Sequence, residues 1–140
     1  MIVYLDTSVL APLFSKDALS DRADRYFNGA LPAVFLSDFA AAEFASAVAR
    51  KARTGALLAE EARATFAAFD AWASTEATRV QVSSADISVA ERFIRRLDLT
   101  LRAPDAIHIA MAIRLDATLA TFDKAMEASA RTLGCAVADA

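Results

Sequence analysis

Short runs of β-forming residues alternate along this chain with longer helical patterns, and this alternation constrains the fold more than any other feature. Residues 2–5 read Ile-Val-Tyr-Leu, and similar runs recur at 33–36, 79–82 and 117–120, with a shorter one at 136–137. No tight hairpin signal joins any of these runs. Because parallel strands need a crossover between them, the pattern predicts an α/β fold with a parallel sheet of about five strands and helices on both faces.

The segments between these runs have the periodicity and the end signals of helices. Ser37 or Asp38 can cap an alanine-rich helix that ends at Thr54-Gly55, and Pro104 suits the first turn of another helix. The predicted helices cover residues 9–14, 19–27, 38–53, 58–74, 84–97, 103–115 and 122–132, and the third and fourth form a helical hairpin. With 140 residues, three glycines and three prolines, the chain is predicted to be a single domain, 1–140, without long linkers.

The apolar composition does not indicate a membrane protein. Hydrophobic residues make up 56% of the chain, but acidic residues interrupt the apolar runs well before the ~20 residues that cross a bilayer. Cys135 is the one cysteine, and the sequence opens without a basic leader, which predicts a cytoplasmic protein. The net charge of −3 argues against a general positive field for nucleic acid, but divalent ions on clustered carboxylates would reverse the local sign.

Three aspartates lie where an open α/β sheet commonly carries its chemistry. Asp6 follows the first strand, Asp105 lies at a helix start, and Asp123 follows the strand at 117–120. Ligands of such folds gather at the carboxyl ends of the strands. Each aspartate could equally be a helix N-terminal residue that caps the helix or interacts with its dipole. Position alone leaves both roles open.

Glu43 is a charged residue on the apolar row of its helix. It shares that row with Phe39 and Ala47, so its carboxylate is predicted to face the protein. An ionised glutamate there needs a cation, a hydrogen-bond network or a raised pKa, and a nearby arginine is the simple alternative. If it converges with the aspartates instead, repulsion of ~4 kcal/mol per close pair at an effective dielectric constant of ~20 calls for a divalent metal.

The kind of metal follows from the available ligands. Carboxylate oxygens favour Mg²⁺ or Mn²⁺ over zinc. The one histidine, His108, and the one cysteine, Cys135, do not supply a zinc-type ligand set.

Four short segments resemble, in sequence and order, the signatures of PIN-domain ribonucleases of the VapC toxin family. They are Leu5-Asp6-Thr7-Ser8, the mid-helix Glu43, the run 103–110 (Ala-Pro-Asp-Ala-Ile-His-Ile-Ala) and Ala120-Thr121-Phe122-Asp123. The resemblance spans nearly the whole chain, and none of the four acidic positions departs from it. It implies a PIN-like fold and a Mg²⁺-dependent endoribonuclease, with Mn²⁺ as a substitute ion, that hydrolyses RNA phosphodiester bonds.

The resemblance also implies roles for individual residues. The catalytic metal site would consist of Asp6, Glu43, Asp105 and Asp123, and the hydroxyls of Ser8 and Thr121 would support it and contact the substrate. Arg102, which lies just before Asp105, is the basic residue that we expect to contact an RNA phosphate. The family resemblance further implies a homodimeric toxin whose active-site groove is occupied by a small VapB-like antitoxin.

Other polar and aromatic residues have structural explanations. His108 lies three residues after Asp105 in an apolar run, so we assign it a structural role rather than that of a general base. Three arginines fit a solvated helix face: Arg92, Arg95 and Arg96. Three aromatic residues at helical spacing fit a core or a partner interface better than a base-stacking platform: Phe66, Phe69 and Trp72.

Two other kinds of function compete with the nuclease. A haloacid-dehalogenase-like phosphatase also places an aspartate after its first strand, but it needs a second one two residues on, where this chain has Ser8, and a late lysine. A phospho-receiver domain fails for similar reasons. The other competitor is a non-catalytic module that keeps the fold and binds RNA or a protein, and the presence of all four acids argues against it.

Overall fold

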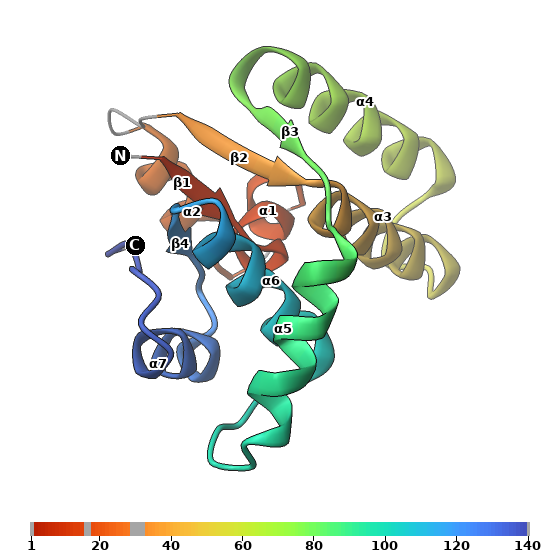
Figure 1. Cartoon of the computed structure of the whole chain (residues 1–140). Helices are drawn as coiled ribbons and strands as arrows, with labels where there is room; N and C mark the ends of the chain where they lie inside the picture. The colour runs from red at the N-terminus through yellow and green to blue at the C-terminus, as the bar shows by residue number, and fades with distance from the viewer. Residues whose placement is uncertain (1, 16–17, 29–32, 140) are drawn as a thin grey trace.

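The computed structural model describes residues 2–15, 18–28 and 33–139, which form an α/β arrangement around one parallel sheet (Figure 1). In chain order its elements are β1 (Val3–Leu5), α1 (Thr7–Phe14), α2 (Ser20–Asn28), β2 (Val34–Ser37), α3 (Asp38–Arg53), α4 (Ala59–Glu76), β3 (Thr78–Val80), α5 (Ser84–Arg95), α6 (Ala103–Arg114), β4 (Thr118–Ala120) and α7 (Lys124–Thr132). The predicted alternation of strands and helices is confirmed.

In the part of the chain that the structure describes, the sheet has four strands in the order β3-β2-β1-β4, and every neighbouring pair is parallel. β1 lies inside the sheet, where Tyr4 pairs with Phe35 on one side and with Leu119 on the other. The predicted fifth strand at 136–137 is instead an isolated parallel bridge between Leu119 and Val137. Leu119 exchanges backbone hydrogen bonds only with Ala136 and Ala138 there, so the segment adds a single paired residue rather than a strand.

Side chains of β1 alternate between the two faces of the sheet, as those of a strand must. Val3 and Leu5 belong to a core formed with α1, α2, α3 and α4, whereas Tyr4 belongs to a second core formed with α5, α6 and α7. Both cores contain residues that are fully buried. The expectation of helices on both faces is therefore confirmed.

Polar contacts explain where several elements start or stop differently from the sequence-based prediction. α1 begins at Thr7 rather than at residue 9 because the Asp6 carboxylate caps it, and α7 begins at Lys124 because Asp123 caps it. β3 ends at Val80, since the next strand-like residue, Val82, donates its backbone N–H to Asp38 Oδ1 at 2.9 Å. At each of these three positions, the carboxylate of an aspartate accepts a hydrogen bond from a backbone N–H.

An aromatic cluster joins the hairpin of α3 and α4 to α1. The rings of Phe44 and Phe69 are stacked with centroids 4.4 Å apart, and Phe14 meets both edge-on. Phe66 and Trp72 pack against the same core, which confirms the structural interpretation of the helical aromatic residues. Because Phe44 directly follows Glu43, this cluster also fixes the position along α3 from which the Glu43 side chain projects.

On the opposite face, α5 packs along α6 (Figure 1). Asp86 on α5 receives two hydrogen bonds from the Arg114 guanidinium on α6, at 2.7 and 2.9 Å. This contact therefore holds α6, the helix that carries Asp105 and His108, against α5. Across the described ranges, no helix is both long enough and apolar enough to cross a membrane.

Candidate active site at the carboxyl edge of the sheet

The four predicted acids line one small pocket at the carboxyl ends of β1 and β4. Its volume is about 140 Å³. Asp6 follows β1, Asp123 follows β4, and helices α3 and α6 supply Glu43 and Asp105. Among the described residues, the lining is Asp6, Thr7, Ser8, Glu43, Arg102, Asp105, His108 and Asp123. Residues that are up to 117 positions apart in the chain thus share one cavity, because parallel strands end at the same edge of a sheet.

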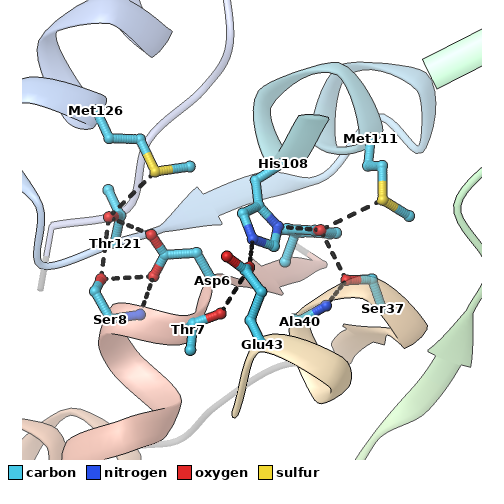
Figure 2. A network of polar contacts seen from close by, with 11 residues as sticks. Asp6, Thr7, Ser8, Ser37, Ala40, Glu43, His108, Met111, Thr121 and Met126 are labelled. Atoms are coloured by element: carbon cyan, nitrogen blue, oxygen red, sulfur yellow. Dashed lines mark hydrogen bonds and ion pairs between the residues drawn. The ribbon is translucent and has the colours of Figure 1, made fainter. Parts of the chain in front are cut away.

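Asp6 is buried, with 4% of its surface exposed, and its carboxylate accepts hydrogen bonds from Ser8 and Thr121. Ser8 donates to Oδ1 from its backbone N–H at 3.0 Å and from its hydroxyl at 2.6 Å, and Thr121 donates to Oδ2 at 2.6 Å (Figure 2). Burial raises the pKa of the Asp6 carboxyl, and these hydrogen bonds oppose that effect. Asp6 therefore caps α1 and faces the pocket at the same time.

The hydroxyls of Ser8 and Thr121 connect the turn after β1 to the turn after β4. They lie 3.2 Å from each other. The backbone N–H of Phe122 donates to Ser8 Oγ at 2.8 Å, and that of Asp123 donates to Thr121 Oγ1 at 3.1 Å. Thr121 is 3% exposed and is not among the residues that line the pocket. The structure thus places it behind Asp6, whereas Ser8 lies at the pocket wall.

Glu43 reaches the pocket from α3 and is held there by two side chains. Its Oε1 accepts a hydrogen bond from Thr7 Oγ1 at 2.9 Å and contacts His108 Nε2 (Figure 2). Burial acts to raise the pKa of Glu43, but the contacts with His108 and Thr7 outweigh it, so the pKa lies below its ordinary value. The partner of this inward-facing acid is a histidine, which sequence reasoning did not pair with it.

Asp105 and Asp123 both begin helices, as the simpler interpretation of each predicted, and both line the pocket as well. Asp105 Oδ2 lies 3.4 Å from the backbone N of Arg102 and 3.6 Å from its Nε. Asp123 Oδ1 accepts a hydrogen bond from the backbone N–H of Met126 at 3.0 Å. The helix-start role and the pocket role are therefore compatible for these aspartates.

Arg102 lies at the rim of the pocket, where its side chain is 81% exposed. It is paired with Asp105 and lowers the pKa of Glu43 as a minor contributor after His108 and Thr7. An exposed guanidinium beside the carboxylates is suited to contact a phosphate that enters the pocket. The structure thus places Arg102 at the pocket, and its contact with an RNA phosphate stays a prediction.

The side chains of the pocket offer oxygen atoms to a divalent cation. Within the described residues, no three histidine, cysteine, aspartate or glutamate side chains stand close enough together to hold an ion as they are now arranged. However, four carboxylates and the Ser8 and Thr7 hydroxyls offer only oxygen donors at the pocket, apart from His108, whose Nε2 is engaged by Glu43. Mg²⁺ keeps several waters and binds through one or two carboxylates, so this donor set fits a hydrated Mg²⁺ or Mn²⁺ ion.

A comparison with protein families identifies the fold. The family model described as PIN domain matches residues 3–131 of the chain. No curated protein sequence matches this chain.

Solved structures with the same fold include toxins and toxin–antitoxin complexes. VapC20 of Mycobacterium tuberculosis, described as a sarcin–ricin loop cleaving toxin, has a TM-score of 0.75 and 22% identity, with 91% of this chain and 94% of that chain covered. VapBC2 of Rickettsia felis bound to a promoter DNA fragment has a TM-score of 0.69 and 16% identity, with 99% and 98% covered. A toxin–antitoxin complex from Klebsiella pneumoniae has a TM-score of 0.58 and 23% identity, with 86% of each chain covered.

The family model covers nearly the whole chain, and the observed sheet and helices agree with the fold of these neighbours. The resemblance found in the four sequence segments is thereby confirmed at the level of family. The chain belongs to the PIN domain family.

Proposed function

We propose that this chain is a Mg²⁺-dependent endoribonuclease that acts as the toxin of a VapBC-like toxin–antitoxin pair. The observation that carries the proposal is the pocket in which Asp6, Glu43, Asp105 and Asp123 meet at the carboxyl edge of the parallel sheet. Membership of the PIN domain family supports it, as does the fold shared with a toxin that is described as cleaving the sarcin–ricin loop.

The four carboxylates are the proposed ligands of the cation, each either directly or through one of its bound waters. When bound, Mg²⁺ or Mn²⁺ would lower the pKa of a water molecule and offset the negative charge that develops on the phosphate. The protein prepares its ligands by hydrogen bonding: Ser8 and Thr121 donate to Asp6, and Thr7 donates to Glu43. Donors of this kind favour the ionised carboxylate, which is the form that binds a cation.

The proposed reaction is hydrolysis of an RNA phosphodiester bond. The oxygen of a water molecule forms the new P–O bond, and the P–O bond to the leaving ribose oxygen breaks. That ribose oxygen takes up a proton released by the water. His108 does not serve as the base in this scheme, because both of its ring nitrogens are engaged, Nδ1 with the Tyr4 hydroxyl at 2.6 Å and Nε2 with Glu43. Arg102 contacts a phosphate of the substrate at the rim, through a guanidinium that is already exposed there.

The proposal includes a protein partner and a place of action. Similar folds occur in VapBC2 of R. felis and in the K. pneumoniae toxin–antitoxin complex, and these support a small VapB-like antitoxin as the partner of this chain. A homodimer of the nuclease and a cytoplasmic location belong to the same proposal. An antitoxin that covers the pocket would keep RNA away from the carboxylates.

The test is an RNA cleavage assay on purified protein freed of any antitoxin. Total cellular RNA is incubated with Mg²⁺, with Mn²⁺ or with chelator, and the same assay is run on Asp6→Asn and on a matched control, Asp98→Asn. Asp98 is an exposed carboxylate that pairs with Arg96 and does not line the pocket. Substitution of groups that only support metal ligands costs about 10–100-fold, so loss of a ligand itself should cost at least about 100-fold.

We expect discrete RNA products that require metal, that persist in Asp98→Asn and that disappear in Asp6→Asn. Equal cleavage by Asp6→Asn and the parent protein would contradict a role for the pocket. If the parent neither cuts RNA nor binds Mn²⁺, the chain is a non-catalytic binding module that retains the PIN fold.

A further inference from the structure

The hydroxyl of Tyr4 lies where three acid-bearing elements of the fold meet. Tyr4 is fully buried on β1, two residues before Asp6. Its hydroxyl is 2.9 Å from Ser37 Oγ, at the start of α3, and 2.6 Å from His108 Nδ1 on α6. α3 carries Glu43 and α6 carries Asp105, so this one phenol, on the strand that leads to Asp6, contacts the N-cap of α3 and a residue of α6.

The contact at Ser37 fixes the beginning of α3. Ser37 is fully buried and is the N-cap of this helix, where its Oγ accepts a hydrogen bond from the backbone N–H of Ala40 at 2.9 Å. The same oxygen receives the Tyr4 hydroxyl. A helix that is held at its first turn has its later side chains at defined positions along the helix axis. Glu43 lies within two turns of this cap.

His108 transmits the contact with Tyr4 directly to Glu43. It is 3% exposed, and its ring lies between those of Tyr4 and Phe39, with centroids 5.6 and 5.1 Å away. Because an ionised carboxylate only accepts hydrogen bonds, Nε2 carries a proton and donates it to Glu43 Oε1. In Figure 2 the His108 ring points toward Glu43, and Ser37 and Met111 lie at the other end of the same chain of polar contacts.

The geometry leaves one oxygen of Glu43 for the pocket. Thr7 and His108 both act on Oε1, from α1 and from α6, and neither of these contacts uses Oε2. A carboxylate that is clamped at one oxygen keeps a fixed orientation of the other. Groups that orient a metal ligand in this way affect metal affinity without touching the ion.

We propose that Tyr4 and His108 are positioning residues that set the orientation of Glu43 for a divalent cation. This inference rests on the proposed metal-dependent function and adds to it two residues that do not themselves bind the ion. It predicts that loss of the contact weakens metal binding even where folding is retained.

The test measures Mn²⁺ affinity without RNA, by electron paramagnetic resonance of free Mn²⁺, in the parent chain and three variants. His108→Leu removes the donor to Glu43, His108→Gln retains an amide N–H at a comparable reach, and Tyr4→Phe removes only the hydroxyl. We expect affinity to fall about 10–100-fold in His108→Leu and in Tyr4→Phe, and to be restored in part by His108→Gln.

Ser83→Ala serves as the control for general destabilisation. Ser83 caps α5 and does not line the pocket, so its loss should lower stability and leave Mn²⁺ affinity unchanged. Tyr4→Phe keeps the ring and is the decisive variant if His108→Leu does not fold. Parental Mn²⁺ affinity in a folded His108→Leu would overturn the role of His108, and parental affinity in a folded Tyr4→Phe would overturn that of Tyr4, without touching the proposed function. A parent chain that binds no Mn²⁺ would instead reject the proposed function on which that role rests.

Discussion

The contact between Asp86 and Arg114 should make a measurable contribution to stability, and Asp86→Asn removes its charge. The side chain of Asp86 is 2% exposed, whereas that of Arg114 is 39% exposed. Asp86 also accepts a hydrogen bond from the backbone N–H of Ser83 at 2.8 Å. The substitution retains a similar shape but removes the negative charge and replaces one acceptor oxygen by an NH2 group, so at most one of the two hydrogen bonds from Arg114 can remain.

The magnitude follows from the unequal burial of the two partners. Removal of one member of a fully buried ion pair costs about 3–5 kcal/mol. Arg114 can regain water because it is partly exposed, so we expect a smaller loss of about 2–3 kcal/mol. At roughly 4 °C per kcal/mol for a chain of this size, Tm should fall by about 8–12 °C.

The assay is thermal and urea unfolding of the parent, Asp86→Asn and Asp98→Asn. Asp98 pairs with Arg96 at 2.8 Å, but both side chains are at least 44% exposed, so its loss should cost less than about 0.5 kcal/mol. A double variant with Arg114→Met separates the pair interaction from the individual losses. A change below about 0.5 kcal/mol in Asp86→Asn would refute the argument that burial distinguishes the two ion pairs.

The difference in stability between the parent and Asp86→Asn should depend on pH, and the direction of that dependence follows from the pKa of Asp86. Burial acts to raise the pKa of Asp86, but hydrogen bonds from Arg114 and Ser83 outweigh it and hold the pKa below its ordinary value. An acid with a lowered pKa in the folded state stabilises that state above its unfolded pKa of about 4, and this stabilisation is lost as the pH falls through the folded pKa. The stability difference between parent and Asp86→Asn should therefore narrow below about pH 4, and a gap that widens there would contradict the sign.

Three further predictions concern the pocket, the core and the buried thiol. Mn²⁺ at 100 times its dissociation constant should stabilise the parent by about 2.7 kcal/mol in thermal unfolding and leave Asp6→Asn nearly unchanged. Phe44→Ala should cost about 4 kcal/mol in urea unfolding, because Phe44 is 1% exposed and stacked on Phe69; a loss below about 1 kcal/mol would argue against this packing. Burial raises the pKa of the Cys135 thiol, so a thiol reagent at neutral pH should modify it in urea and not in the native protein, and rapid native modification would disprove its burial.

The elements of this fold could be predicted because their signals are local. An apolar run that ends at Asp6 predicts a strand with an acid at its carboxyl end, and Pro104 predicts the start of α6; the structure shows both. The end of the third strand was predicted wrongly because a distant side chain took a backbone partner there. Asp38 receives the N–H of Val82, 44 residues away, and no local pattern in the strand at 79–82 could announce that contact.

The pairing of Glu43 with His108 shows the limit of the same reasoning for the site. Glu43 was predicted to face the protein from an apolar helical row, and His108 was given a structural role because it lies in an apolar run. Their contact joins α3 to α6 across 65 positions of sequence, so it depends on tertiary packing rather than on spacing. Two inward-facing polar residues that each need a partner were the available signal, and matching one with the other would have found the contact.

The proposed function requires the four carboxylates to form one cation site. The measurement that tests it is the anomalous scattering of Mn²⁺ in crystals of the parent chain and of Asp6→Asn, at a metal concentration that supports RNA cleavage. The account predicts anomalous density in the pocket between Asp6, Glu43, Asp105 and Asp123 in the parent, and its loss in Asp6→Asn. Cleavage-competent protein with Mn²⁺ bound elsewhere, or with none in this pocket, would contradict it.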